Sequence, residues 1–228
     1  IEFTFLGFIG MVSSLSLTPF NFFIINFFTF SSLYLFLCKK LKQKTNVKIF
    51  FLYGWAFGFG FFVTNLYWIS ISLTFDQSFK FLIPFTFVLI PSFLALFYGL
   101  ISYFFAVLKP KSIVSSFLIF SLIFGVIEFL RGIVLTGFPW NLIVYSLSNQ
   151  LELLSITSII GTYGLNLFCI SLFTSPAIFI IKDRNKDIGF FVLSGKIPSG
   201  QIKIIFSPLF DELTFIKSLL IDTVFTLV

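Results

Sequence analysis

Residues 112–141 read SIVSSFLIFSLIFGVIEFLRGIVLTGFPWN, a long apolar stretch followed by a short run that favours a turn. The stretch 112–135 is long enough for a helix to cross a bilayer, which takes about 20 apolar residues. Glu128 and Arg131 are the only charged residues inside the long apolar stretches of this chain. A charge within hydrocarbon costs roughly 2.5–3.5 kcal/mol on insertion scales, so it marks a functional group or a buried pair.

The composition extends the membrane interpretation to the whole chain. The sequence is 58% hydrophobic and 11% charged, with a mean hydropathy of +1.08. A soluble domain carries about 25% charged residues, so this chain needs lipid as its solvent. There is no histidine, and Cys38 and Cys169 both lie in apolar stretches. We therefore expect no histidine-based triad, no metal site, no disulfide framework and no cofactor.

Hydropathy predicts an all-α fold, a polytopic transmembrane helix bundle of about six spans with a short irregular C-terminal tail. Besides 112–135, which holds the charged pair, four stretches carry no charge, namely 20–38, 49–73, 81–108 and 153–181. A sixth stretch, 3–17, is shorter and weaker. Pro84 and Pro91 are expected to kink the span 81–108, which membrane helices tolerate.

The basic residues predict the orientation of the bundle. Those on one side follow the second, fourth and sixth spans: Lys39, Lys40, Lys42, Lys44, Lys48, Lys109, Lys111, Lys182, Arg184 and Lys186. The loops on the opposite side contain a single basic residue, Lys80. The positive-inside rule places the lysine-rich side in the cytoplasm and the loop 136–152 outside. The amino terminus is then cytoplasmic if 3–17 counts as a span, and it lies outside if 3–17 does not cross. Because orientation accounts for the basic residues, we expect no nucleic-acid partner.

Glu128 and Arg131 fit two interpretations. Glu128 lies sixteen residues into its span, about 24 Å at 1.5 Å per residue and therefore near the outer face. Residues three apart are neighbours on one face of a helix. The two side chains either form an ion pair that snorkels to the interface, or form a polar wall that faces the interior of the bundle beneath the outer loop.

Aromatic residues and glycines in the spans have structural interpretations. Trp68 lies at the outer end of the third span, where tryptophan is an ordinary interface anchor. Gly54 and Gly58 have the spacing that lets helices approach closely. Gly161 and Gly164 in the sixth span are interpreted in the same way.

Three groups of residues occur in a fixed order along the chain. The first runs from Gly58-Phe59-Gly60-Phe61-Phe62 to Asn65-Leu66-Tyr67-Trp68-Ile69. The second group begins with Glu128-Phe129-Leu130-Arg131-Gly132, continues with Thr136-Gly137-Phe138-Pro139-Trp140-Asn141 and ends at Tyr145. The third group is Gly161-Thr162-Tyr163-Gly164-Leu165. Together with Pro19-Phe20 they resemble the membrane domain of the apolipoprotein N-acyltransferase family. The resemblance covers roughly residues 3–182.

The resemblance implies a location and a reaction. Members of this family lie in the bacterial inner membrane and move a phospholipid acyl chain to the N-terminal amine of diacylglyceryl-cysteine lipoproteins. Membrane phospholipids and lipidated apolipoproteins are therefore the implied partners. Six residues would form a lipid- or substrate-binding rim: Trp140, Glu128, Arg131, Asn141, Tyr145 and Trp68. Trp140 would guide acyl chains, and Glu128 and Arg131 would position its loop.

The family's catalytic part has no counterpart in this sequence. In the family, a nitrilase-like domain carries a Glu-Lys-Cys triad, but here no cysteine follows Cys169. No catalytic residue is therefore assigned. We expect residues 1–187 to be the transmembrane domain, and 188–228 to be a tail, a remnant or the start of a truncated seventh span and catalytic domain. On this expectation the chain is truncated and inactive alone.

Two other functions are left open by the sequence. A small polytopic transporter would be favoured by broken helices and charges near the membrane midplane. A non-catalytic membrane scaffold would pair with a separately encoded catalytic domain.

Overall fold

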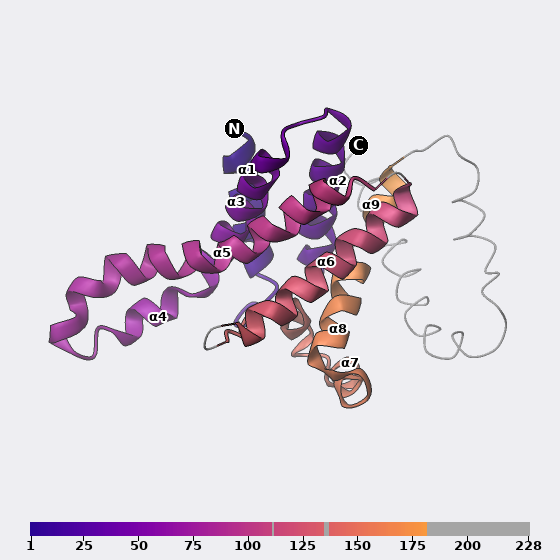
Figure 1. Cartoon of the computed structure of the whole chain (residues 1–228). Helices are drawn as coiled ribbons and strands as arrows, with labels where there is room; N and C mark the ends of the chain where they lie inside the picture. Colours follow the sequence, from indigo (N-terminus) through magenta and orange to yellow (C-terminus); the bar gives the residue numbers. More distant parts are fainter. Residues whose placement is uncertain (111, 135–136, 182–228) are drawn as a thin grey trace, which may run out of the picture. The chain divides into compact units, whose positions relative to one another are not determined.

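The computed structural model describes residues 1–110, 112–134 and 137–181, and every regular element in this part of the chain is helical (Figure 1). In order these are α1 (Glu2–Ser14), α2 (Ile25–Lys42), α3 (Val47–Asn65), α4 (Tyr67–Ser72), η1 (Gln77–Leu82), α5 (Ile83–Leu108), α6 (Ile113–Ile133), η2 (Ile143–Leu147), α7 (Leu151–Ser155), α8 (Thr157–Thr174) and α9 (Pro176–Ile180). The predicted all-α fold is confirmed. The described residues belong to one compact unit. The predicted tail 188–228 lies outside them.

Four described helical stretches are long and apolar enough to cross a membrane. They are Val47–Asn65, Lys80–Leu108, Ile113–Ile133 and Thr157–Ile180. The apolar α1 has 13 residues, and the 18-residue α2 carries three lysines in its last turn. A helical membrane bundle follows from these lengths and compositions, while the number six stays a prediction.

Local sequence determines where several helices begin and end. The Asn46 side chain accepts a hydrogen bond from the Lys48 backbone N–H at 3.0 Å and caps α3. Ser112 caps α6 in the same way, because its Oγ accepts from the Ser115 N–H at 3.1 Å. Pro84 lies in the first turn of α5, where its missing N–H leaves no hydrogen bond unmade. The helix continues through Pro91 to Leu108.

The six longest described helices form a closed ring of neighbours, in the order α1, α3, α5, α6, α8, α2 and back to α1. Aromatic side chains fill the inside of this ring. Phe30 of α2, Phe57 of α3, Tyr98 of α5 and Phe124 of α6 are buried, and each ring contacts the next with centroids 5.1–6.0 Å apart. Aromatic rings paired in such geometries attract each other, and this attraction stabilises the bundle beyond the contribution of the buried area.

Glycine lets α3 approach both α1 and α5. A Cβ at Gly60 would collide with the carbonyl oxygen of Gly7 in α1, and a Cβ at Gly54 would collide with that of Tyr98 in α5. The close approach predicted from Gly54 and Gly58 is therefore confirmed. Gly161 differs, because its φ is 73° at a kink within α8 and nothing lies within 4 Å of a Cβ built there. The packing role predicted for Gly161 is wrong.

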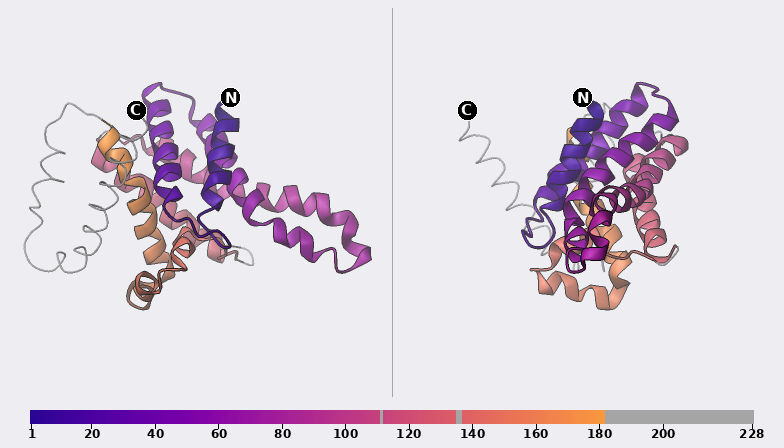
Figure 2. Two further views of the ribbon diagram at one scale, coloured as in Figure 1. Left: turned by 180° about the vertical axis from the view of Figure 1, so that it is seen from behind. Right: turned by 90° about the vertical axis from the view of Figure 1, so that its left-hand side faces the viewer.

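A hairpin made by α4 and the first half of α5 extends away from the helix ring (Figures 1 and 2). Its apolar side chains are widely exposed, with Phe75 at 88% and Leu89 at 60%. Such exposure is expected of a segment that faces lipid, which is as apolar as the side chains themselves. The base of this hairpin carries Trp68 beside the loop that follows α6.

Candidate functional site

Glu128 and Arg131 form a buried ion pair in the last two turns of α6. Arg131 Nη2 lies 2.5 Å from Glu128 Oε2, and both side chains are 0% exposed. The Phe62 ring of α3 lies against the guanidinium, 5.4 Å from ring centroid to Arg131 Cζ. The pair therefore faces the bundle interior, and the snorkelling alternative is wrong. Leaving either partner alone in this environment would be strongly destabilising.

Arg131 also holds the loop that follows its helix. Its Nη1 donates hydrogen bonds to the carbonyl oxygens of Phe138 at 2.8 Å and of Trp140 at 3.0 Å. The Phe138 backbone N–H donates in return to the Arg131 carbonyl oxygen at 2.9 Å. Gly137, with φ 72°, adopts the left-handed conformation that the return of the chain requires. Thr136 of the predicted motif lies outside the described residues.

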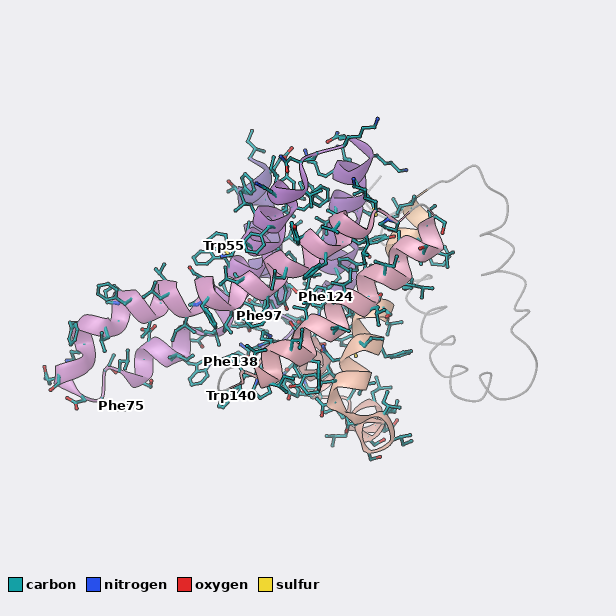
Figure 3. All side chains as sticks on the ribbon, in the orientation of Figure 1. Trp55, Phe75, Phe97, Phe124, Phe138 and Trp140 are labelled. Carbon is teal, nitrogen blue, oxygen red and sulfur yellow. The ribbon has the colours of Figure 1, made fainter. Side chains whose placement is uncertain are left out.

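Three aromatic rings stack over this loop. The Trp140 ring lies 5.5 Å from the Trp68 ring of α4, with an interplanar angle of 21°, and 6.3 Å from the Phe138 ring, with 29° between the planes. Figure 3 shows Phe138 and Trp140 close together near one end of α6. Trp68 and Trp140 remain 41% and 55% exposed. They form an exposed aromatic edge.

An apolar pocket lies between α5 and the loop after α6. Its volume is about 330 Å³, within the range of about 300–1,000 Å³ that is usual for ligand sites. The lining residues are Leu89, Ile90, Phe93, Leu94, Phe97, Arg131, Val134, Gly137 and Phe138. Arg131 is the single charged residue among them, and its side chain is 0% exposed, so the pocket suits an apolar chain.

Asn141 and Tyr145 follow Trp140 along the chain. Asn141 has φ 57° and ends the turn; the residue is half-buried, and its buried side-chain amide nitrogen has no hydrogen-bond partner among the described residues. Tyr145 lies in η2 and is 39% exposed. Partial burial raises the pKa of Tyr145, with Tyr163 acting in the same direction and Arg131 against it, so the phenol stays protonated at neutral pH. Both residues follow the loop directly along the chain.

Sequence reasoning missed two buried residues of this region. Asn166 of α8 is buried, and its Oδ1 accepts a hydrogen bond at 3.0 Å from the backbone N–H of Val144, which ties η2 to the bundle. A polar residue inside an otherwise apolar span was the available signal. Tyr98 of α5 is also buried and interacts electrostatically with Glu128 and Arg131. Nothing in its local sequence indicates this position.

The two cysteines lie apart from the candidate site in the sequence. Cys169 is buried in α8, and Cys38 Sγ lies 3.6 Å from Ser116 Oγ. Within the part of the chain that the structure describes, no group of three or more Cys, Asp or Glu residues could hold a metal ion. The arrangement offers a binding pocket, an aromatic edge and a fixed loop.

Known proteins are similar to most of this chain. Residues 9–173 match the family described as apolipoprotein N-acyltransferase N-terminal domain. A relative of that name from Rhodopseudomonas palustris is 38% identical over 179 residues, which are 77% of this chain and 33% of the relative. One from Rickettsia prowazekii is 36% identical over 171 residues, covering 73% of this chain and 32% of the relative. The chain spans about a third of the length of these curated relatives.

Proposed function

We propose that this chain, which belongs to the apolipoprotein N-acyltransferase family, holds an acyl chain of a membrane lipid in the pocket between α5 and the loop after α6. The observation that carries the proposal is the position of Arg131, which borders an apolar pocket and whose buried guanidinium anchors the Trp140 loop. A lipid tail in this pocket would contact Phe138, whose ring stacks on Trp140. Trp140 and Trp68 would extend the aromatic surface of Phe138 beside that lipid.

The family's name supports a role in transferring the held chain to apolipoproteins. We propose membrane phospholipids and lipidated apolipoproteins as the partners of the complete reaction. The 228 residues contain no cysteine besides Cys38 and Cys169, both of which lie within helices. A thiolate nucleophile needs a positioned base beside it. We therefore expect these 228 residues by themselves to bind lipid without transferring the chain.

The ion pair favours this function over a transporter. Transport sites lie near the bilayer midplane, between broken helices. Glu128 and Arg131 instead occupy the last two turns of α6, and Arg131 is engaged by the loop that follows.

We further propose the orientation expected in a bacterial inner membrane, with the amino terminus in the cytoplasm and the Trp140 loop outside. Single cysteines at Gln43, after α2, and at Asn149, after η2, test it in a background with Cys38→Ala and Cys169→Ala. Both positions are exposed. A membrane-impermeant maleimide added to intact cells should label Asn149→Cys and spare Gln43→Cys, and the reverse pattern would contradict the orientation.

Lipid binding is tested on the purified chain in detergent micelles. Phospholipid brominated on its acyl chains is titrated in while tryptophan emission is recorded. We expect saturable quenching that Ile90→Phe weakens, because the larger ring fills the pocket. Leu118→Phe, on the exposed face of α6, is the matched control and should bind like the wild type. Quenching that rises without saturation, and equally in both variants, would contradict the proposal.

A further inference from the structure

The two walls of the apolar pocket come from segments that are distant in the sequence. One wall is a single face of α5, from Leu89 to Phe97, and the other includes Gly137 and Phe138 of the loop after α6. The width of the pocket therefore depends on the contacts that hold this loop at a fixed distance from α5.

Arg131 holds the loop, and Glu128 in turn holds Arg131. The Arg131 Nη1 donates to the carbonyl oxygens of Phe138 and Trp140. The Nη2 of the same side chain lies 2.5 Å from Glu128 Oε2. Because both charged residues belong to α6, the ion pair fixes the loop relative to α6. A further contact has to join the pair to the wall that α5 provides.

Tyr98 of α5 supplies this contact. Its side chain is buried, and its hydroxyl forms a hydrogen bond with the Glu128 carboxylate. The ring of Phe62 touches both sides, because its centroid lies 5.3 Å from the Tyr98 ring and 5.4 Å from Arg131 Cζ. The residue before Tyr98 is Phe97, which lines the pocket. A continuous series of contacts thus runs from one wall of the pocket to the other.

The Tyr98 side chain has little freedom to move. The rings of Phe57, Phe62 and Phe124 surround it, with centroids 5.1–6.0 Å from its own. A Cβ at Gly58 of α3 would lie 2.7 Å from the Tyr98 Cβ, so glycine leaves the space that this side chain occupies. A hydroxyl on so closely packed a ring is a fixed point for the carboxylate that it binds.

We propose that Tyr98 is a positioning residue, which acts through Glu128 and Arg131 to set the place of the Trp140 loop and thereby the width of the pocket. A buried acceptor that loses its donor is costly, so the carboxylate would turn toward another partner and Arg131 would follow it. Tyr98 itself is outside the lining of the pocket. The position of the loop does not rest on the proposed function, whereas the effect on a bound lipid does.

Tyr98→Phe tests the proposal, because it removes the hydroxyl and keeps the ring. Near-ultraviolet circular dichroism of the Trp68–Trp140 stack reports the position of the loop, whose Trp140 carbonyl oxygen is bound by Arg131. We expect Tyr98→Phe to lose most of the coupled signal while the far-ultraviolet spectrum stays that of the wild type. Tyr103→Phe, which removes a hydroxyl from the same helix, should retain the signal. A coupled signal of wild-type strength in Tyr98→Phe would overturn the proposal.

A second variant separates positioning from packing. Phe57→Leu removes a ring that lies 6.0 Å from the Tyr98 ring and leaves the hydroxyl in place. It should lower the melting temperature in detergent and still retain the coupled signal, when spectra are recorded well below the melting temperature. Equal losses of the signal in Phe57→Leu and Tyr98→Phe would show that packing is the cause and would overturn the positioning role.

Lipid binding separates this inference from the proposed function. Phospholipid brominated on its acyl chains is titrated into the wild type, Tyr98→Phe and Tyr103→Phe. We expect Tyr98→Phe to bind about 3- to 10-fold more weakly, as for the loss of one hydrogen bond, and Tyr103→Phe to bind like the wild type. Unchanged binding by Tyr98→Phe would overturn its effect on the pocket. If the wild type shows no saturable binding, the proposed function fails, and the coupled signal still decides whether Tyr98 positions the loop.

Discussion

Arg131 and Trp140 are joined by a hydrogen bond of 3.0 Å from the Arg131 Nη1 to the Trp140 carbonyl oxygen. This contact connects the buried ion pair of α6 to the exposed aromatic edge of the loop. One guanidinium thus neutralises Glu128 and fixes the backbone that carries Trp140. Loss of the Arg131 side chain should consequently affect both the stability of the bundle and the geometry of the loop.

Arg131→Ala should destabilise the protein by about 3–5 kcal/mol, because Glu128 would remain buried and unpaired. The double variant Glu128→Leu with Arg131→Leu should lose less stability than Arg131→Ala, because no buried charge is left without a partner. Unfolding of the purified variants by SDS titration in mixed micelles measures both losses. A double variant at least as unstable as Arg131→Ala would show that the unpaired carboxylate is not the cause.

The stack of Trp68 on Trp140 should produce a coupled signal in near-ultraviolet circular dichroism. Trp68→Phe and Trp140→Phe should each remove the same component, since both rings are needed. Trp55→Phe is the control, because Trp55 stacks on Phe59 at 5.1 Å within α3. Different components lost in the first two variants would contradict the stacked arrangement.

Gly60→Ala should destabilise the bundle by about 1–3 kcal/mol, because its methyl group would press on the backbone of Gly7 in α1. Gly164→Ala is the matched control, since the nearest atom to its added Cβ belongs to Ile160 at 3.4 Å. Alanine is also the better helix former, so the control should be neutral or gain up to about 1 kcal/mol. Thermal unfolding in detergent measures the stability of both variants. Equal stability changes in Gly60→Ala and Gly164→Ala would refute the close contact of α1 with α3.

Glu2 should make part of the stability dependent on pH. Its carboxylate accepts hydrogen bonds from Lys40 Nζ at 2.5 Å and from the Tyr53 hydroxyl at 2.6 Å, which joins the ends of α1, α2 and α3. These bonds lower the pKa of Glu2 below its ordinary value of 4.5. The stabilisation is therefore complete above about pH 4.5 and is lost as the pH falls through the lowered pKa.

Melting temperatures of the wild type and Glu2→Gln, compared between pH 3 and pH 7, measure this dependence. The wild type should be the more stable at neutral pH, and the difference should shrink as the pH falls below 4.5. Glu152→Gln is the control, because Glu152 is exposed at the start of α7. A difference between wild type and Glu2→Gln that stays constant over this range would contradict the assignment.

Much of the fold was predictable because hydropathy and capping act locally. The stretch predicted at 112–135 became α6 at Ile113–Ile133, with Ser112 as the capping residue. The close approach at Gly54 was also predictable, since glycine spacing is visible in one segment. Spacing alone could not decide whether Glu128 and Arg131 snorkel or face inward, because that depends on which neighbouring helices cover α6.

The remaining features depend on contacts between distant segments. Trp68 was interpreted as an interface anchor, and its stacking on Trp140 arises only because α4 lies beside the loop after α6. Tyr98 looks like any aromatic residue of an apolar span until α5 packs against α6. The kink at Gly161 likewise has no signal in composition, since the same residue would also suit a helix contact.

The most direct measurement of lipid holding is cross-linking in vesicles by a phospholipid with a photoactivatable group at the end of one acyl chain. Leu94 lines the pocket but is only 3% exposed, whereas Leu122 is 57% exposed on α6. Mass spectrometry should find adducts on the buried Leu94 as well as on Leu122, and Ile90→Phe should remove only the adducts on Leu94. Adducts confined to exposed residues such as Leu122 would contradict an acyl chain held in the pocket.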